Sequence, residues 1–173
     1  MSKPKIVVLG AGLGGSIAAF ELRHQLRDAA EIMAVSDSEY FSFVPSNPWV
    51  FVRWREPEQV QVHLPPGGAR QGSGVTAAGA TRVVAAENRI ELGDGSSLAY
   101  DYLVIATRPE LAFDEIEGLG PDGGHTVSVC QTAHATAAAA AFDRFVENPG
   151  PIVVGAVQGA SCFGPAYEFA MIL

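Results

Sequence analysis

Two cysteines and a histidine are the residues of this chain best suited to redox or thiol chemistry. Cys162 lies in a glycine-rich turn shortly before Gly164-Pro165, a pair typical of a helix start. Cys130 precedes an alanine-rich helical segment, and His134 falls in the first turn of that segment. The positive amino end of a helix favours a thiolate, and a nearby imidazole can accept or return a proton. These positions predict sulfur chemistry.

The same residues also have structural explanations. Cys162 could simply pack a turn, and Cys130 with His134 could be a half-buried thiol beside a surface imidazole. Two cysteines are too few for a disulfide scaffold, which favours a reducing compartment. Glu168, one turn into the last helix, could relay protons, but we interpret it as a solvated or capping carboxylate.

A glycine-rich segment near the amino terminus predicts a second kind of chemistry. Gly10, Gly12 and Gly15 form the pattern G-x-G-x-x-G, with Gly14 inside it. Gly10 allows the tight turn, Gly12 lets the backbone approach a pyrophosphate, and Gly15 lets helix and strand pack closely. The helix that follows offers unpaired N–H groups to the anion. A glycine turn without a ligand is the alternative, but the strand–turn–helix context favours a dinucleotide site.

Other cofactor contacts are expected where later strands end. Ser36 and Asp37 close a second strand about twenty residues further on, and either could bind the ribose hydroxyls. A buried strand ending in Ala106-Thr107 is typical of FAD-binding domains, although it could be only a core strand. Arg108 stands where such domains normally have glycine, so a side chain would face the cofactor there.

The elements that must position these residues follow an α/β pattern. The continuous apolar runs Lys5–Leu9 and Glu31–Val35 predict parallel strands buried on both faces. Between them, helical spacing runs from Gly14 to about Arg27. Its inner face is expected to contain Ile17, Phe20, Leu22 and Leu26.

The rest of the chain alternates clear and weak patterns. Tyr40–Trp54 is expected to be a structured loop with a helical turn, and Val60–Gly79 gives no periodicity. A helix is predicted at Thr132–Glu147, capped by Thr132, and a buried strand from Pro151. Short strands, three of them around the hairpin turn Asp94-Gly95, are expected at Thr81–Ala85, Arg89–Leu92, Ser97–Tyr100 and Tyr102–Ala106.

These elements define an α/β fold class with two domains. Residues 1–110 are expected to form a Rossmann-like FAD-binding domain, with a parallel sheet and a small antiparallel β-meander. Residues 111–173 are expected to be the first strand and helix of a second dinucleotide-binding-like domain.

Composition excludes several classes of function. The 173 residues carry a net charge of -8 and no run of cations, which argues against nucleic-acid binding. Lys3 and Lys5 precede an apolar run, as in a signal peptide, but glycines interrupt that run and a helix pattern follows it. We expect no signal peptide, no transmembrane helix and no metal site.

Three segments of the sequence closely resemble the sulfide:quinone oxidoreductases, flavoproteins of the pyridine nucleotide-disulfide oxidoreductase superfamily. They are Ser42–Trp49, Cys130–His134 and Gly155–Phe169. The resemblance implies FAD as the cofactor, sulfide as the electron donor and a membrane quinone as the acceptor. A homo-oligomer is left open, as is a location in the cytoplasm or at a membrane surface.

The resemblance also implies roles for individual residues. Cys162 matches the cysteine that carries sulfur, Cys130 an additional cysteine of many members, and His134 an acid/base. The cofactor-binding set comprises Gly10, Gly12, Gly14 and Gly15 at the pyrophosphate, Ser36 and Asp37 at the ribose, Ala80 on the adenine side, and Ala106 and Thr107 against the cofactor.

The sequence departs from that family in several respects. The partner cysteine, the quinone pocket and the amphipathic membrane anchor of the family belong to its C-terminal half, whereas this chain stops inside a helix. We therefore expect it to represent the N-terminal part of such a protein, with little or no turnover by itself. Arg53 also stands where a small residue is usual.

Two other functions remain open at this point. One is an NAD(P)H-linked flavin reductase resembling type II NADH dehydrogenases, which carry a second glycine fingerprint where this chain has Gly155–Gly159 and Cys162. The other is a non-catalytic nucleotide-binding remnant.

Overall fold

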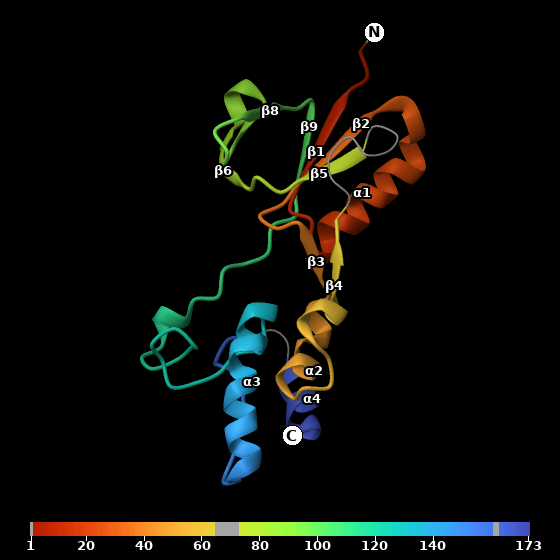
Figure 1. Ribbon diagram of the computed structural model, residues 1–173. Coiled ribbons are helices and arrows are strands. Elements are labelled where there is room, and N and C mark those ends of the chain that lie inside the picture. Colours follow the sequence, from red (N-terminus) through yellow and green to blue (C-terminus); the bar gives the residue numbers. More distant parts are fainter. Residues whose placement is uncertain (1, 65–72, 161–162) are drawn as a thin grey trace. The chain divides into compact units, whose positions relative to one another are not determined.

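The computed structural model describes residues 2–64, 73–160 and 163–173 (Figure 1). The chain divides into two compact units, Met1–Phe41 with Val62–Glu110 and Ser42–Gln61 with Leu111–Leu173. The change of unit after Glu110 falls where the sequence suggests a domain boundary. The segment Ser42–Gln61, however, belongs with the second unit although it lies early in the chain. The assignment of domains stays a prediction.

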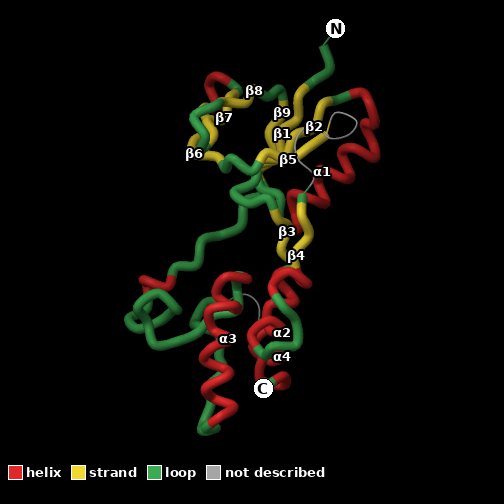
Figure 2. The backbone as a smooth tube through the Cα atoms, viewed as in Figure 1, coloured by secondary structure: helices red, strands yellow, loops and turns green. Residues whose placement is uncertain are grey.

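The first unit is built on a parallel sheet of four strands in the order β5-β2-β1-β9 (Figure 2). Their bounds are Ser73–Thr76 for β5, Glu31–Val35 for β2, Lys5–Leu9 for β1 and Tyr102–Ile105 for β9. The registers place Leu9 opposite both Val35 and Ile105. The carboxyl ends of the strands therefore meet at one edge, as predicted for a Rossmann-like sheet.

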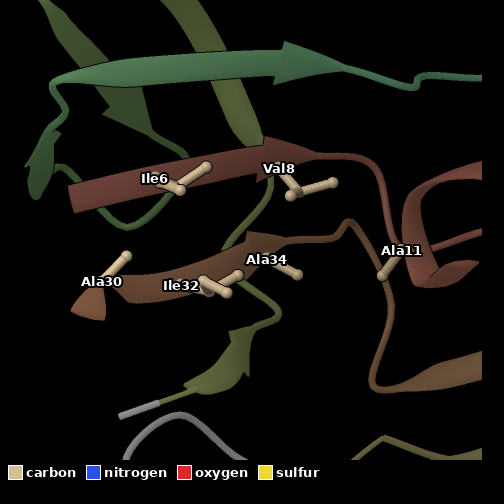
Figure 3. Packing of buried hydrophobic residues seen from close by; sticks show 6 residues of the cluster. All are labelled: Ile6, Val8, Ala11, Ala30, Ile32 and Ala34. Atoms are coloured by element: carbon tan, nitrogen blue, oxygen red, sulfur yellow. The ribbon is translucent and has the colours of Figure 1, made fainter. Parts of the chain in front are cut away.

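Both faces of the two central strands are covered, which explains their unbroken apolar sequences. Alternate residues of β1 and β2 pack on one side, in a cluster that contains Ile6, Val8, Ala11, Ala30, Ile32 and Ala34 (Figure 3). The intervening residues Val7, Leu9 and Val35 pack on the other side against Ile90 and Leu92.

Helix α1 (Leu13–Leu26) follows β1 and contributes Ala19 and Leu22 to the first of these clusters. The predicted inner face of this helix was wrong in part, because the side chain of Phe20 is 78% exposed and that of Ile17 is 59% exposed. With 3.6 residues per turn, Gly15, Ala19 and Leu22 share one face of the helix, and Ile17 and Phe20 lie on another.

The predicted β-meander is confirmed as the antiparallel sheet β6-β7-β8. Its strands are Ala80–Val84, Arg89–Leu92 and Ser97–Ala99. Gly95, with φ of 85°, makes the turn after β7. The first unit also contains two short 3-10 helices, η1 (Arg27–Ala29) and η4 (Ala85–Glu87). Strand β3 (Tyr40–Ser42) pairs with β4 (Gln61–His63), and each of these two strands includes residues of both units.

The second unit is helical. Its elements are η2 (Val44–Ser46), α2 (Asn47–Phe51), η3 (Pro57–Val60), η5 (Phe113–Glu115), α3 (Thr132–Glu147) and α4 (Gly164–Ile172). The ring of Phe51 in α2 lies 5.5 Å from that of Phe142 in α3 and 4.8 Å from that of Phe169 in α4, measured between centroids. The predicted helices at 132–147 and from Gly164 are therefore confirmed, and aromatic packing joins them to α2.

Two predictions for this unit are wrong. Residues 151–157 belong to no strand of the described chain, and Val153 is 98% exposed. A strand requires a neighbour for its backbone hydrogen bonds, and no described strand lies beside this segment. Thr132 does not cap α3, because Gln131 occupies the cap position. The Thr132 hydroxyl instead donates a hydrogen bond to Asn47 Oδ1.

Candidate cofactor and thiol sites

The glycine turn lies directly after β1, at the carboxyl edge of the parallel sheet. Gly10 has φ of 103°, a conformation that favours glycine, and its N–H donates to the carbonyl oxygen of Val35 at 2.8 Å. A Cβ atom on Gly10 would lie 2.8 Å from the carbonyl carbon of Ala106 and 3.1 Å from the nitrogen of Thr107. The structure thus brings together the first glycine and the Ala106-Thr107 segment, which are distant in sequence.

The four glycines of this turn have different surroundings. A Cβ on Gly15 would overlap the carbonyl group of Gly10 and lie 3.5 Å from Ala106 Cβ, so Gly15 permits close packing of helix on strand. A Cβ on Gly12 or Gly14 would meet no atom within 4 Å. Gly12 and Gly14 therefore face open space, where another molecule could approach the backbone.

The amino end of α1 is suited to an anion. The helix begins after Gly12 with no side-chain cap, and its first turn contains no acidic residue. The first N–H groups of a helix lack partners within the helix, and the helix dipole adds partial positive charge there. A bare helix end beside two glycines that leave room fits the pyrophosphate of a dinucleotide such as FAD.

The predicted ribose residues follow β2 at the same edge. Ser36 is 7% exposed and its Oγ accepts a hydrogen bond from the N–H of Ser38 at 3.1 Å. Its backbone N–H donates to Thr76 O at 2.8 Å, so the residue is held on both sides. Asp37 is exposed. Of the two candidates, the carboxylate of Asp37 is therefore the group that a ligand could reach.

The remaining predicted cofactor residues lie at the ends of neighbouring strands. Ala106 follows β9, and its N–H donates to Leu9 O at 2.8 Å. Thr107 and Arg108 come next and are exposed, as is Ala80 at the start of β6. The Arg108 side chain, which departs from the glycine expected here, therefore lies in solvent.

The predicted thiol residues belong to the second unit. Cys130 is a free, exposed cysteine, and its N–H donates to Ser128 Oγ at 3.2 Å. His134, in the first turn of α3, is half-buried against Phe113, with 5.7 Å between ring centroids. Its Nδ1 atom is buried without a hydrogen-bond partner among the described residues. Cys162, the third predicted catalytic residue, lies outside the described residues.

The described residues contain neither a cluster of metal-binding side chains nor a membrane-spanning helix. No group of at least three His, Cys, Asp or Glu side chains in residues 2–64, 73–160 and 163–173 could hold a metal ion. No helix in the same part of the chain is long and apolar enough to cross a membrane.

Two residues for which the sequence predicts no role have unusual conformations or surroundings in the structure. Asn47 is a fully buried polar residue that bonds to the segment beside Cys130. Arg53 has φ of 62° and forms an ion pair with Asp143 at 2.7 Å. The left-handed conformation explains why a small residue would suit position 53. A polar residue before a proline gives no signal of burial, and Asn47 could not be found from sequence.

The parallel sheet, the glycine turn and the bare end of α1 define a dinucleotide-binding α/β domain. The chain belongs to the pyridine nucleotide-disulphide oxidoreductase family, which it matches over residues 4–161. Proteins of this family are FAD-binding flavoproteins, in agreement with the cofactor that the resemblance implies.

Within this family, the chain is similar to individual proteins of known function. The chain is 37% identical to the sulfide-quinone reductase of Aquifex aeolicus over 97% of its own length and 38% of that protein. The crystal structure of the sulfide:quinone oxidoreductase from this bacterium matches 98% of the chain with a TM-score of 0.88. The mitochondrial sulfide:quinone oxidoreductase of Dictyostelium discoideum is 31% identical over 66% of the chain and 25% of that protein. The chain thus spans well under half of these relatives.

Proposed function

We propose that this chain forms the FAD-binding part of a sulfide:quinone oxidoreductase. The observation that carries the proposal is the 37% identity to the Aquifex sulfide-quinone reductase across 97% of the chain. The glycine turn supports it physically, because Gly12 and Gly14 leave space at a bare helix end. Residues 1–110 would form the FAD domain and residues 111–173 the start of a second dinucleotide-binding-like domain.

The residues of the first unit would bind and orient FAD. Gly10 and Gly15 set the geometry of the turn, and the N–H groups near Gly12 and Gly14 bond to the pyrophosphate. We assign the ribose contact to Asp37, because the Ser36 hydroxyl is buried and already bonded to Ser38. Ala80 on the adenine side, with Ala106 and Thr107, would line the rest of the cofactor.

The cysteine thiols of this chain would bind and carry the sulfur atom of sulfide. Bound FAD supplies a two-electron acceptor for sulfide oxidation. Cys162 is the candidate sulfur carrier and Cys130 a second thiol. A cysteine thiol and sulfide can be joined as a persulfide only when two electrons are removed, and these electrons would pass to the bound FAD. His134 would accept a proton from a cysteine thiol or return one to it. Sulfide as donor, quinone as acceptor, and a location in the cytoplasm or peripheral to a membrane are parts of the same proposal.

Flavin absorbance tests the first step. The purified chain should retain FAD and show the absorbance bands of a bound flavin. Under anaerobic conditions we expect sulfide to bleach these bands and NADH to leave them unchanged. Bleaching by NADH would instead support an NAD(P)H-linked flavin reductase. A colourless protein that does not take up added FAD would support a non-catalytic remnant.

Cysteine variants separate cofactor binding from sulfur chemistry. Cys162→Ser should retain FAD but lose bleaching by sulfide, because a serine hydroxyl cannot form the S–S bond of a persulfide. Cys130→Ser is the matched variant for the second thiol and should slow the bleaching. Rapid bleaching by sulfide in the double variant would show that neither thiol takes part.

A further inference from the structure

One buried polar side chain bonds α2 to the segment that carries Cys130, where Val129 also packs against the apolar clusters that contain Val50 and Phe51 of α2. Asn47 is 0% exposed, in the second unit, at the start of α2. Its Nδ2 donates to the carbonyl oxygen of Val129 at 3.0 Å, and its Oδ1 accepts from the Thr132 hydroxyl at 3.0 Å. A buried amide is costly unless both of its ends are bonded, and here each end has a partner.

The chemistry of the partners fixes the orientation of this amide. The carbonyl of Val129 can only accept a hydrogen bond, so the NH₂ group of Asn47 must face it. The Oδ1 atom then faces Thr132, whose hydroxyl serves as the donor. Neither aspartate, which lacks the donor, nor leucine, which lacks both groups, could make these two bonds.

The two bonded residues lie on either side of Cys130. Val129 precedes it, and Thr132 is the first residue of α3. The N–H of Cys130 donates to Ser128 Oγ at 3.2 Å, and the helix starts with a bond from Ala135 N–H to Gln131 O at 3.0 Å. An exposed thiol therefore stands on a backbone that is held before and after it.

We propose that Asn47 is the positioning residue of Cys130: its buried amide holds Val129 and Thr132 and so fixes the thiol at the start of α3. The function of this placement rests on the role proposed above for Cys130. The bond to Asn47 also explains why the Thr132 hydroxyl does not cap its own helix. The positioning acts through the backbone, because the amide groups of Asn47 are bonded to Val129 and Thr132 rather than to the thiol.

Hydrogen exchange and a spin label test the proposal without FAD or sulfide, so its outcome is independent of the proposed function. In Thr132→Val the hydroxyl is lost at almost constant volume and Asn47 Oδ1 is left unpaired. We expect the amides of Cys130 and Ala135 to exchange roughly five- to a hundredfold faster, the range that follows from leaving a buried polar group unpaired. Thr132→Ser keeps the hydroxyl and should restore slow exchange.

A matched control lies one turn along the same helix. The Thr136 hydroxyl donates to Thr132 O at 2.8 Å and is not bonded to Asn47. Thr136→Val should therefore leave exchange at Cys130 unchanged. Amides of β1 and β2, which belong to the other unit, serve as an internal reference in each variant.

A nitroxide on Cys130, in a chain with Cys162→Ser, reports on the thiol itself. We expect a slower, broader spectrum in the parent and in Thr132→Ser, and a sharper, more mobile spectrum in Thr132→Val and Asn47→Leu. If Asn47→Leu unfolds the second unit, the comparison of Thr132→Val with Thr132→Ser is sufficient to test the proposal. Native exchange and native label mobility in Thr132→Val would overturn the proposal, as would equal effects of Thr136→Val.

Discussion

Gly15 packs against the carbonyl group of Gly10, so the first turn of α1 rests directly on the turn that ends β1. A Cβ on Gly15 would overlap the Gly10 carbonyl oxygen and lie 2.8 Å from its carbon. A Cβ on the adjacent Gly14 would meet nothing within 4 Å. The two neighbouring glycines therefore serve different purposes. Gly15 lets the helix pack on the strand, and Gly14 leaves space for another molecule to approach the backbone.

Alanine substitutions should separate these purposes by their effect on stability. Gly15→Ala forces the helix away from the strand, and we expect a loss of about 1–3 kcal/mol in the free energy of unfolding. Gly14→Ala adds a methyl group in open space within a helix and should gain about 0.5–1 kcal/mol. Urea unfolding followed by circular dichroism measures both. Equal effects of the two variants would contradict the packing role of Gly15.

Gly12→Ala should affect the cofactor more than the fold. Its Cβ would enter the open space at the end of α1, where we propose that the pyrophosphate lies. We expect a change of no more than about 1 kcal/mol in the stability of the FAD-free chain. The dissociation constant for FAD, measured by titration of flavin fluorescence, should rise about tenfold or more, because the phosphate can no longer approach the backbone.

Gly150→Ala is the control for this measurement, since a Cβ on Gly150 also meets no atom within 4 Å but lies in the other unit. It should leave FAD affinity unchanged. Unaltered FAD affinity in Gly12→Ala would place the pyrophosphate elsewhere.

The two central strands of the first unit could be predicted from sequence because their information is local, whereas β5 (Ser73–Thr76) lies in the stretch Val60–Gly79, which gives no periodicity. Lys5–Leu9 and Glu31–Val35 are strands with the predicted bounds, since burial on both faces demands an unbroken apolar run. Asp94-Gly95 likewise marks the turn of the meander, where Gly95 has positive φ. The glycine pattern predicts a turn in which Gly15 permits close packing of helix on strand, and the overlap of a Gly15 Cβ with the Gly10 carbonyl agrees with that prediction.

The second unit could be predicted less well because its contacts are long-range. Asn47 and Thr132 are far apart in sequence, and nothing local shows that their side chains are bonded to each other. Local rules would make Thr132 a cap, but the tertiary hydrogen bond takes its hydroxyl. The segment after Pro151 has the composition of a strand without a described partner strand. Composition predicts a tendency to form a strand, but hydrogen bonding to a neighbouring strand decides whether the strand forms.

The left-handed conformation of Arg53 gives a prediction about the backbone alone. Arg53 has φ of 62° and Asn88 has φ of 48°, so both residues lie in the left-handed region of backbone conformation. Asparagine tolerates this region, but arginine rarely adopts it. Arg53→Gly and Arg53→Ala both remove the guanidinium, but only glycine adopts this conformation without strain. We expect the glycine variant to be more stable than the alanine variant by about 1 kcal/mol in urea unfolding. Equal stabilities would mean that the backbone relaxes when the side chain is removed.

The ion pair between Arg53 and Asp143 should make stability depend on pH. Two hydrogen bonds join the side chains, from Nε to Oδ1 at 3.2 Å and from Nη2 to Oδ2 at 2.7 Å. Hydrogen bonding to Arg53, with a smaller contribution from its charge, lowers the pKa of Asp143 below its ordinary value of 3.8. A carboxyl whose pKa is lower in the folded chain adds stability above its unfolded pKa. That contribution is lost as the pH falls through the folded value.

Asp143→Asn tests this dependence. Both side chains are about half exposed, so we expect the melting temperature to fall by at most about 3 °C at neutral pH. The difference from the parent should shrink below about pH 4 and vanish once the parent carboxyl is protonated. Asp122→Asn, the same change at another exposed carboxylate of this unit, controls for net charge. A difference that persists undiminished in acid would mean that Asp143 stabilises the unit by packing, because a charge interaction cannot outlast the charge.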